Sequence, residues 1–512
     1  METTHNSPAG TKVLCSAAVV ATAAALVGCG IRSRIESLNS PQQAVWADAP
    51  RDENVTRVVN RVSFGPWPGD LSTASHMGVH GYLEEQLASN LPEDGAASWR
   101  VNGLDVQQDV QDASDELTSL PDNQLLTEVQ QVQLLRAVYS THQLHEVMSD
   151  FWENHFNIYA LKNAARQRIP VEMEKAIRPN VMGRFEEMLI AVAHSPAMLA
   201  YLDNNHNQVG TADRVNENYA RELLELHTLG VHSGYTQIDI HQVARCLTGW
   251  TVSGGFRQWE FEFDSAWHDN GAKYIPFLHL ALAPNGGARD GEAVLHTLAH
   301  HPATAHHLAE QLCIKFIGTS HPATVRAAAN AYLRSNTSIK AMLRPILLDG
   351  LTKPEICAPI FKRPLDLLVS SFRAGATDSD CGIRVQGFLD GMGQPLFQWP
   401  MPDGYPTTAA AWKTTLLPRW NFAAALAGGK IPGTTWRMHD CLLGNHATDT
   451  NHAVDSLAEA VYGIPSNSAT LQPVLATLYD HARAANRSGL KPAAVLTEVA
   501  SLLIASPAYQ WK

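Results

Sequence analysis

The hydrophobic pattern of the chain is most informative in residues 216–237, which read NENYARELLELHTLGVHSGYTQ. At 100° per residue, Asn216 and His227 fall on one face of a helix, whereas Tyr219 and Leu224 fall on two others. Apolar side chains therefore occur all the way round this segment. Such a pattern is typical of a helix that is enclosed by protein rather than one that lies on a surface.

The same segment carries charged residues at helical spacing. Glu217, Arg221 and Glu225 follow one another at intervals of four residues. Charges in an enclosed helix need partners, and this spacing predicts that Arg221 bridges both carboxylates. Gly230 is predicted to end the helix, because glycine readily adopts the left-handed conformation of a C-terminal cap. A structural ion-pair network is one interpretation of the three charged residues, and a reactive site is the other.

Helical periodicity recurs along most of the chain, and one region has a strand-like pattern instead. Between residues 250 and 277, aromatic and charged residues alternate, which predicts a small β-hairpin or an extended loop. The fold class is therefore predicted to be mainly α, with two packed helical lobes and a small β-like insertion. The predicted helices span residues 53–62, 83–87, 125–156, 183–193, 196–202, 239–248, 291–300, 304–316, 323–333, 339–348, 364–372, 412–427, 454–462, 471–485 and 492–504.

Length and charge set the domain organisation and exclude one class of partner. The chain has 512 residues, and a single core rarely grows beyond about 250–300 residues. We therefore expect an N-terminal lobe at 53–250, an insertion and loop at 251–290, and a C-terminal lobe at 291–512. The net charge of −12 and the lack of a long basic run argue against nucleic-acid binding, which needs a basic surface.

The N-terminus has the pattern of an export signal. Lys12 precedes an apolar run from Val13 to Gly28, and Cys29 follows Leu-Val-Gly directly. This arrangement resembles a bacterial lipobox, which predicts a signal peptide at 1–28, lipidation of Cys29 and a polar tether at 29–52. The protein is accordingly expected to be an exported cell-envelope lipoprotein that a lipid anchor holds to a membrane. A plain signal peptide or a short anchor helix is the alternative, although the run is shorter than a membrane span of about 20 residues.

The cysteines exclude some familiar motifs. Seven occur, and no two form a CxxC pair, so a zinc ribbon and a thioredoxin motif are excluded. One or two disulfides are compatible with an oxidising compartment. Cys246 and Cys313 lie within apolar helical patterns and are predicted to be buried free thiols. The cysteines outside the signal and the proposed lipidation site are Cys246, Cys313, Cys357, Cys381 and Cys441.

The run NENYARELLELHTLGV resembles the hallmark of a bacterial family called domain of unknown function 1800. Other segments agree with that family in the same order: RVSFGPWPGDL, DFWENHFNI, HSPAMLAYLDN, ARCLTGW, WHDNGAK, HPATAHHLAEQL, KRPLDLLVSSFRA and GQPLFQWPMPDGYP. The resemblance covers residues 53–505 and implies an exported, mostly helical protein without implying a reaction. Two departures, YIPF after Lys273 and a rearranged segment at 285–290, imply an altered pocket there.

Four groups of polar residues are candidates for one functional site. Together they offer imidazole, carboxylate and amine groups, which suffice for acid–base chemistry. No GxSxG nucleophile elbow and no GxxxxGK[ST] phosphate loop occurs. The groups are Trp152, Asn154 and His155; Asn216, Glu217, Glu222, Glu225 and His227; Asp239, Arg245 and Trp250; and His268, Asp269 and Lys273.

The leading functional hypothesis is a hydrolase or lyase that acts on a cell-envelope or polysaccharide polymer. Two carboxylates, one of them kept protonated by burial, suit the cleavage of glycosidic bonds, and Glu217 and Asp269 are the candidate general acid and base. His227 would be their proton partner, and Arg221 would orient the carboxylates. The alternative is a non-catalytic envelope scaffold or binding protein. The hypothesis predicts that His155, His227 and Asp269 line one water-accessible pocket.

Aromatic and polar residues near these groups are candidates for substrate binding. Trp250 and Trp267 could stack on sugar rings, and Asn216 and Lys273 could donate hydrogen bonds. The simpler interpretation is that the tryptophans of the predicted hairpin pack on helices.

No cofactor is evident in the sequence, and a divalent metal is the minor alternative. His155 and His268 are weak candidate ligands, because neither HExxH nor a paired ExxH motif is present. His227 has no ligand residue four positions away. The histidines of HHPATAHH, His300, His301, His306 and His307, are predicted to lie mainly on the surface, with His301-Pro302 at the start of a helix.

Overall fold

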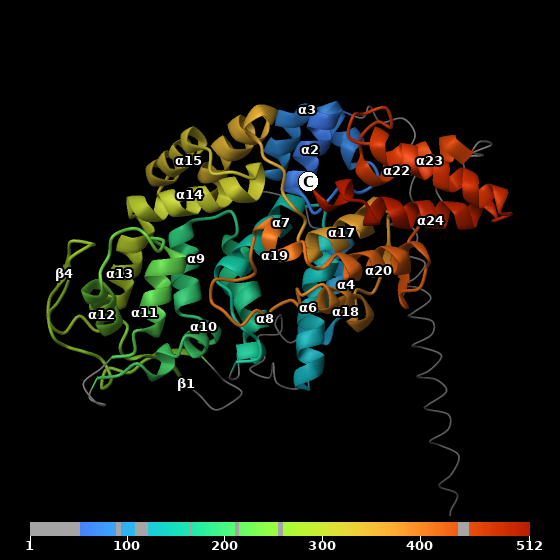
Figure 1. The fold of residues 1–512 in the computed structure, drawn as a ribbon. Coiled ribbons are helices and arrows are strands. Elements are labelled where there is room, and N and C mark those ends of the chain that lie inside the picture. The colour runs from blue at the N-terminus through green and yellow to red at the C-terminus, as the bar shows by residue number, and fades with distance from the viewer. Residues whose placement is uncertain are drawn as a thin grey trace, which may run out of the picture. The chain divides into compact units, whose positions relative to one another are not determined.

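A computed structural model describes residues 52–88, 94–107, 121–162, 165–209, 215–253, 260–438 and 450–512, which all belong to one compact unit. These residues form a mainly α structure with three short antiparallel strand pairs (Figure 1), so the predicted fold class is confirmed. The predicted signal peptide, nearly all of the predicted tether, Cys29, Cys441 and the loop at 254–259 lie outside the described residues. Among those described, no helix combines the length and apolar character that crossing a bilayer would require.

Four helices of the first half begin and end within two residues of their predicted limits, and these are Glu53–Val62, Phe185–Ala193, Pro196–Tyr201 and Gln237–Cys246. The predicted helix at 125–156 is divided, because Ser140 has extended backbone angles and its hydroxyl accepts the His142 N–H. The helix predicted at 83–87 begins much earlier and is kinked at Gly78, whose φ is 72°. The α-helices are α2 (Glu53–Val62), α3 (Asp70–Gln86), α4 (Gly95–Val101), α6 (Asp122–Tyr139), α7 (Gln143–His155), α8 (Ile169–Val171), α9 (Phe185–Ala193), α10 (Pro196–Tyr201), α11 (Asn218–Glu222) and α12 (Gln237–Cys246).

The second half is helical almost throughout, as predicted. Several helices begin with proline just after an extended residue. This position suits proline, because it has no backbone N–H and the first N–H groups of a helix have no partner within it. Among the described residues, three π-helical turns occur. Two lie in the first half, at Glu172–Ile177 and Leu223–His227, and one lies in the second half, at Pro345–Leu351. The α-helices are α13 (Arg289–Ala299), α14 (Pro302–Ile317), α15 (Pro322–Arg334), α16 (Ile339–Arg344), α17 (Pro364–Ala374), α18 (Ile383–Gly391), α19 (Ala409–Trp412), α20 (Leu416–Ala427), α22 (Thr450–Tyr462), α23 (Gln472–Arg487) and α24 (Pro492–Ala505).

The predicted β-like insertion forms two antiparallel strand pairs. In the first, β1 (Trp250–Ser253) pairs with β2 (Glu260–Phe263), and Trp250 lies opposite Phe263. In the second, β3 (Lys273–Ile275) pairs with β4 (Leu280–Leu282). A third pair, β5 (Asp378–Ser379) with β6 (Thr434–Thr435), was not predicted, because two-residue strands leave no alternating pattern.

The main hydrophobic core of the described residues extends from Val55 to Tyr509, and Phe361, Tyr405 and Trp412 form a small separate cluster. Helices that the sequence assigns to different lobes pack directly on each other, α9 against α13 and α6 against α17. Figure 1 shows α9, α11, α12 and α13 gathered together, and α20, α22, α23 and α24 gathered elsewhere. Cys246 and Cys313 are buried free thiols, as predicted, and Cys357 and Cys381 are also free.

Candidate functional site

The central segment is α11, which continues into the π-helical turn at Leu223–His227. Tyr219, Leu224 and His227 are buried, so the apolar part of the prediction is confirmed. Gly230 ends the segment as predicted, with a φ of 84° and its N–H bonded to the Leu224 carbonyl at 3.2 Å. π-Helical turns occur frequently at functional sites, and nothing in the hydrophobic pattern predicts this one.

The charged residues of this segment are not enclosed, which corrects the prediction. The side chains of Glu217, Arg221 and Glu225 remain 29%, 38% and 27% exposed. Arg221 does bridge both carboxylates, at 3.7 Å to Glu217 and 3.4 Å to Glu225, so the predicted pairing is confirmed. Glu217 also accepts hydrogen bonds from Gln237 and contacts His241 on α12, which ties α11 to α12. The contacts of these three residues are those of the structural ion-pair network.

Asn216, a predicted substrate-binding residue, shapes the turn before α11. Its N–H donates to Asn207 Oδ1 at 2.9 Å, and its side-chain amide donates to the Asp203 carbonyl at 2.9 Å. Its Oδ1 accepts the Asn218 N–H at 3.0 Å. These contacts occupy both ends of the side-chain amide, so its observed role is to hold the backbone.

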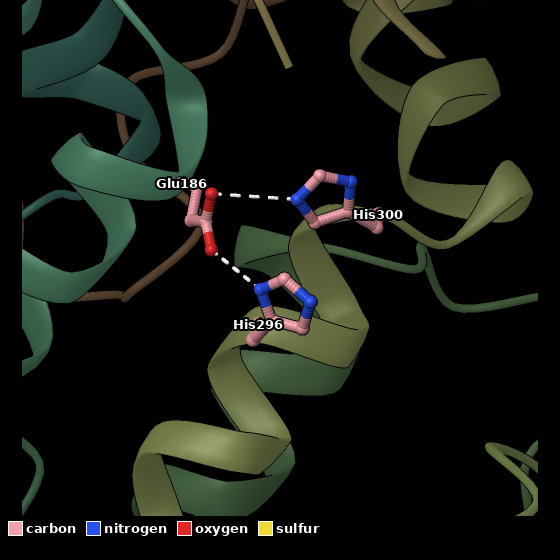
Figure 2. Close-up of side chains that lie close together, drawn as sticks. All are labelled: Glu186, His296 and His300. Carbon is pink, nitrogen blue, oxygen red and sulfur yellow. Dashed lines mark hydrogen bonds and ion pairs between the residues drawn. The ribbon is translucent and has the colours of Figure 1, made fainter. Parts of the chain in front are cut away.

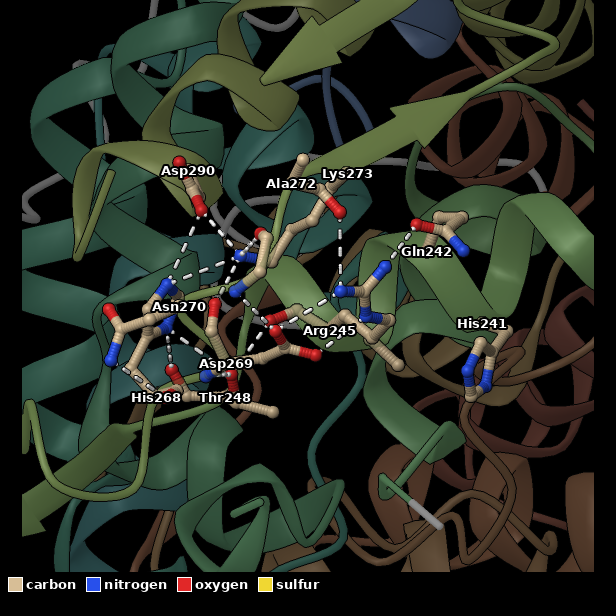
Figure 3. A network of polar contacts seen from close by, with 12 residues as sticks. His241, Gln242, Arg245, Thr248, His268, Asp269, Asn270, Ala272, Lys273 and Asp290 are labelled. Atoms are coloured by element: carbon tan, nitrogen blue, oxygen red, sulfur yellow. Dashed lines mark hydrogen bonds and ion pairs between the residues drawn. The ribbon is translucent and has the colours of Figure 1, made fainter. Parts of the chain in front are cut away.

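Asp269 pairs with Arg245 on α12 (Figure 3). The guanidinium donates to both carboxylate oxygens, at 2.6 and 3.1 Å. Burial raises the pKa of Asp269, but the Arg245 hydrogen bonds and the Gly271 N–H outweigh that effect and hold the pKa below its ordinary value. The lowered pKa favours the ionised form of Asp269, which suits its ion pair with Arg245.

Lys273 and His268 fasten the loop after β2 to neighbouring helices (Figure 3). The buried Lys273 ammonium donates to Asp290 at 2.7 Å and also to the Asp269 carbonyl. His268 contacts the Thr248 carbonyl at 2.7 Å through Nδ1 and Asp290 at 3.3 Å through Nε2. Because both side chains are buried and have protein partners, their contacts are structural in this structure, whereas Lys273 was predicted to bind substrate and His268 was only a weak candidate metal ligand.

Trp250 is a core residue, which corrects its predicted role in stacking on sugars. It is 0% exposed, and its ring lies 5.3 Å from Phe261 and 4.7 Å from His194 between centroids. A Cβ on Gly291 would overlap the indole, so α13 packs tightly on it. Trp267 is half-buried and keeps some accessible surface.

A cavity of about 250 Å³ lies elsewhere, and we call it the His155 cavity. Five segments that carry the sequence motifs meet at its wall, although they lie far apart along the chain. They are the end of α7, the π-helical turn, α14, the start of α17 and the loop before α19. The polar lining residues are Asn154, His155, His307, Gln311, Lys315, Arg363, Asp366, Asp403, Tyr405, Thr407 and Lys512.

The end of α7 holds the loop that covers one side of this cavity. Asn154 accepts the Tyr405 N–H at 2.7 Å and donates to the Tyr405 carbonyl at 3.1 Å. Asn157 donates to the Met401 carbonyl at 2.7 Å. Gly404 has a φ of 70°, and a Cβ there would overlap the Asn154 backbone, so only glycine suits this close approach. The segments DFWENHFNI and PDGYP, which lie far apart in the sequence, therefore contact each other directly in the fold.

His155 and His307 both line this cavity, with ring centroids 6.4 Å apart. His155 Nε2 lies 3.1 Å from the His227 carbonyl, so it must carry the hydrogen and Nδ1 is left as an acceptor. Burial lowers the pKa of His155 well below its ordinary value, with smaller contributions from His227 and His307. Burial lowers the pKa of His307 as well. Both imidazoles are therefore uncharged at neutral pH.

His227 lies behind His155 rather than in the cavity wall. It is 1% exposed, and neither ring nitrogen has a hydrogen-bond partner among the described residues. Burial lowers its pKa to about 3. The predicted proximity of His155 and His227 is correct, with ring centroids 6.1 Å apart, but Asp269 lines neither this cavity nor the second one described below. The backbone carbonyl of His227 positions the His155 ring, whereas the His227 ring, which was predicted to be the proton partner, does not line the cavity.

A buried ionic network forms another wall of the His155 cavity, and the sequence analysis missed it. Arg363 bonds to Asp150 and, at 3.2 Å, to Asp366. Lys315 binds Asp150 at 3.1 Å, and Lys512 binds Asp366 at 2.8 Å. Burial raises the pKa of both carboxyl groups, but the three cations outweigh it and hold both groups ionised. The sequence did carry a signal for this network: Arg363 and Asp366 lie three residues apart at the start of the apolar segment KRPLDLLV.

A second cavity, of about 240 Å³, lies beside Glu172 and His194. The Glu172 carboxyl is buried, and neither of its oxygens has a partner among the described residues. Burial raises its pKa well above the ordinary value and lowers the pKa of His194. A carboxyl group whose pKa is raised and an imidazole whose pKa is lowered thus line this cavity, and neither residue was singled out from the sequence as reactive.

The fold and the cavities define a class of mainly α proteins in which uncharged histidines and a buried ionic network face one cavity. The chain belongs to the family described as protein of unknown function (DUF1800), whose family model matches residues 57–511. The resemblance noted from the motifs is thereby confirmed. No curated protein and no solved structure matches the chain.

Proposed function

We propose that the protein is an extracytoplasmic hydrolase or lyase whose reaction takes place in the His155 cavity, on an anionic cell-envelope or polysaccharide polymer. One observation carries the proposal: two uncharged imidazoles face a cavity whose wall also bears three cationic side chains. Such a site offers a base and a place for negative charge to develop.

His155 is the candidate general base. Because its Nε2–H is held by the His227 carbonyl at 3.1 Å, Nδ1 carries the lone pair that would accept a proton. The pKa of His155 is lowered by burial, so the base is unprotonated over the physiological range. His307, 6.4 Å away between ring centroids, is the candidate partner in proton transfer.

The cations favour an anionic group in the substrate. Lys315, Arg363 and Lys512 carry three positive charges, whereas Asp150 and Asp366, to which they are bonded, carry two negative charges. Asp403 is a further acidic side chain in the cavity wall, so binding of an anion would not depend on an excess of positive charge. The N–H donors of Lys315, Arg363 and Lys512 could bind a carboxylate and stabilise an enolate or oxyanion formed from it. Phe151, Phe361 and Tyr405 add aromatic surface against which a sugar ring could pack.

The test is turnover of two defined polymers, purified peptidoglycan sacculi and polygalacturonate, followed by release of soluble fragments. We expect fragments with the native chain, and we expect release to fall to background in His155→Gln and His307→Gln, because either change removes an imidazole from the cavity. His306→Gln is the matched control, since His306 lies beside His307 on α14 but is exposed. Fragment release by folded His155→Gln at the native rate would refute the role of His155.

The second candidate function is a non-catalytic envelope scaffold or binding protein. It is favoured by the contacts of Glu217, Arg221 and Glu225, which join α11 to α12 and line neither cavity. The same assay separates the two candidates. A scaffold would sediment with sacculi or bind polygalacturonate without releasing fragments from either.

We also propose that a lipid on Cys29 anchors the protein to a membrane. The support is the apolar run ending Leu-Val-Gly-Cys, which has the pattern of a lipoprotein signal. A Cys29→Ala variant is expected to lose the lipid and to move from the membrane fraction to the soluble extracytoplasmic fraction or to stay unprocessed. The measurement is metabolic labelling with a fatty acid, followed by fractionation. Equal labelling of the variant and the native protein would contradict this proposal.

A further inference from the structure

A histidine pair on α13 faces a carboxylate on α9, away from the residues used in the proposed reaction. His296 and His300 are four residues apart, which places both rings on one face of the helix. Figure 2 shows both rings turned toward Glu186, in the first turn of α9. His296 Nδ1 lies 2.6 Å from one carboxylate oxygen, and His300 Nε2 lies 3.3 Å from the other.

We propose that Glu186, His296 and His300 bind a divalent transition-metal ion of the Zn²⁺ class. One potential ligand atom of each residue lies within 4.8 Å of the other two. Around a tetrahedral zinc ion with bonds of about 2.0–2.1 Å, neighbouring ligand atoms lie roughly 3.3 Å apart. The required adjustments are therefore small, and the exposed His296 ring has room to make them.

The ligand types favour this class of metal over calcium or magnesium. Two imidazoles and one carboxylate suit zinc, iron, cobalt and nickel, whereas calcium and magnesium prefer oxygen ligands only. Three protein ligands leave at least one coordination position open. Because His296 is 63% exposed, that position is accessible to water or a small ligand.

Hydrogens on the two rings must shift when the metal binds. The nitrogens that face Glu186 must present lone pairs to the metal, so each hydrogen must reside on the other ring nitrogen. His296 and His300 are both at least partly exposed, so water can accept a hydrogen bond from that second nitrogen.

Arg184 is the group that a metal would have to displace. It bonds to Glu186, but its Nε also donates to the Asn336 carbonyl at 3.0 Å, and it pairs with Glu187 at 3.3 Å. The guanidinium therefore keeps partners after it leaves Glu186. The bound ion would then link α9 to α13, two helices that already pack together.

The test is Zn²⁺ binding to the full chain, purified without a histidine tag, stripped with a chelator and titrated against a chromophoric chelator. We expect His296→Ala and His300→Ala each to lower the affinity at least about tenfold, since even residues that only support a ligand change metal affinity by about 10–100-fold. We also expect Zn²⁺ to raise the melting temperature of the native chain, and to raise it less in both variants.

His306→Ala is the matched control. His306 is also an exposed histidine on a helix, and it contacts one carboxylate, Glu310, at 3.6 Å, but it lies outside the proposed ligand set. This variant is expected to keep the native affinity. Co²⁺ in place of Zn²⁺ should give visible bands of a low-coordinate site in the native chain and in His306→Ala, but weaker or altered bands in the other two variants.

Two outcomes would overturn the proposal. In one, Zn²⁺ neither binds with defined stoichiometry nor shifts the melting temperature, which would leave Glu186 and its partners as an ion-pair cluster only. In the other, folded His296→Ala and His300→Ala bind Zn²⁺ as tightly as His306→Ala, which would place the metal elsewhere. Neither outcome depends on polymer turnover, so this inference stands or falls separately from the proposed reaction.

Discussion

Replacing Arg363 with methionine is expected to lower the free energy of unfolding by about 3–5 kcal/mol. Arg363 is the only residue among those described that bonds to both Asp150 and Asp366. Its loss would leave two buried, ionised carboxylates with one ammonium each, Lys315 for Asp150 and Lys512 for Asp366. Removing one partner of a buried ion pair is costly, because the remaining charge cannot recover its hydration.

The measurement is urea unfolding of Arg363→Met at neutral pH, followed by circular dichroism. Arg344→Met is the matched control, because Arg344 also pairs with a carboxylate, Glu84, but both side chains are 45% exposed. An exposed pair typically contributes less than about 1 kcal/mol, so this variant should unfold almost as the native chain does. A loss of similar size in the two variants would mean that the Arg363 network contributes no more than a surface pair.

Acidification from pH 7.5 to pH 5 is expected to lower the stability contributed by His227 by about 2 kcal/mol. The unfolded chain binds a proton at His227 with an ordinary pKa near 6.5, whereas burial lowers the folded pKa to about 3. Below pH 6.5 the unfolded state therefore binds more protons than the folded state. Stability is complete above the unfolded pKa, and it falls progressively as the pH drops toward 3.

The measurement is urea unfolding of the native chain and of His227→Leu at both pH values. Leucine fills a similar space and cannot titrate, so the fall in stability between pH 7.5 and pH 5 should be smaller in the variant by about 2 kcal/mol. His232→Leu is the control, since His232 lies five residues further along and is exposed. If His227→Leu keeps the full native pH dependence, the buried His227 ring is not its source.

Several structural features follow from local sequence alone. Helix α2 occupies its predicted range, because Asp52 caps its first turn and the pattern of apolar residues continues to Val62. The break between α9 and α10 lies at His194-Ser195 as predicted, since the Ser195 hydroxyl accepts the Ala197 N–H and proline follows. Gly230 ends the central segment for a local reason too, because glycine readily adopts the positive φ that the chain has there.

The candidate site shows where local reasoning stops. His155 was singled out correctly as a residue close to His227, but both side chains were expected to line one pocket. In the structure one ring lines a cavity and the other ring is enclosed by packed residues. Helical periodicity places both rings on inward-facing surfaces, but it cannot distinguish a surface that borders a cavity from one that borders core.

The buried charges show more strongly that local sequence patterns do not predict contacts between distant segments. Arg363 and Asp150 are 213 positions apart, and no periodicity relates them. By contrast, Glu217, Arg221 and Glu225 are related by helical spacing, so their pairing was predictable, but their exposure depended on what packs over them. The residues that looked most reactive from spacing are therefore partly solvated, and the buried charges of the Arg363 network were not recognised.

The sequence by itself determined the helical class, many helix limits, the region of the β-like insertion and the family, because these depend on periodicity, caps and contiguous motifs. Tertiary structure alone decided which polar groups face a cavity, which are ionised and which histidines approach a carboxylate. The physical reason is that burial and charge pairing are properties of a local volume. Such a volume is filled by segments that meet only when the chain has folded.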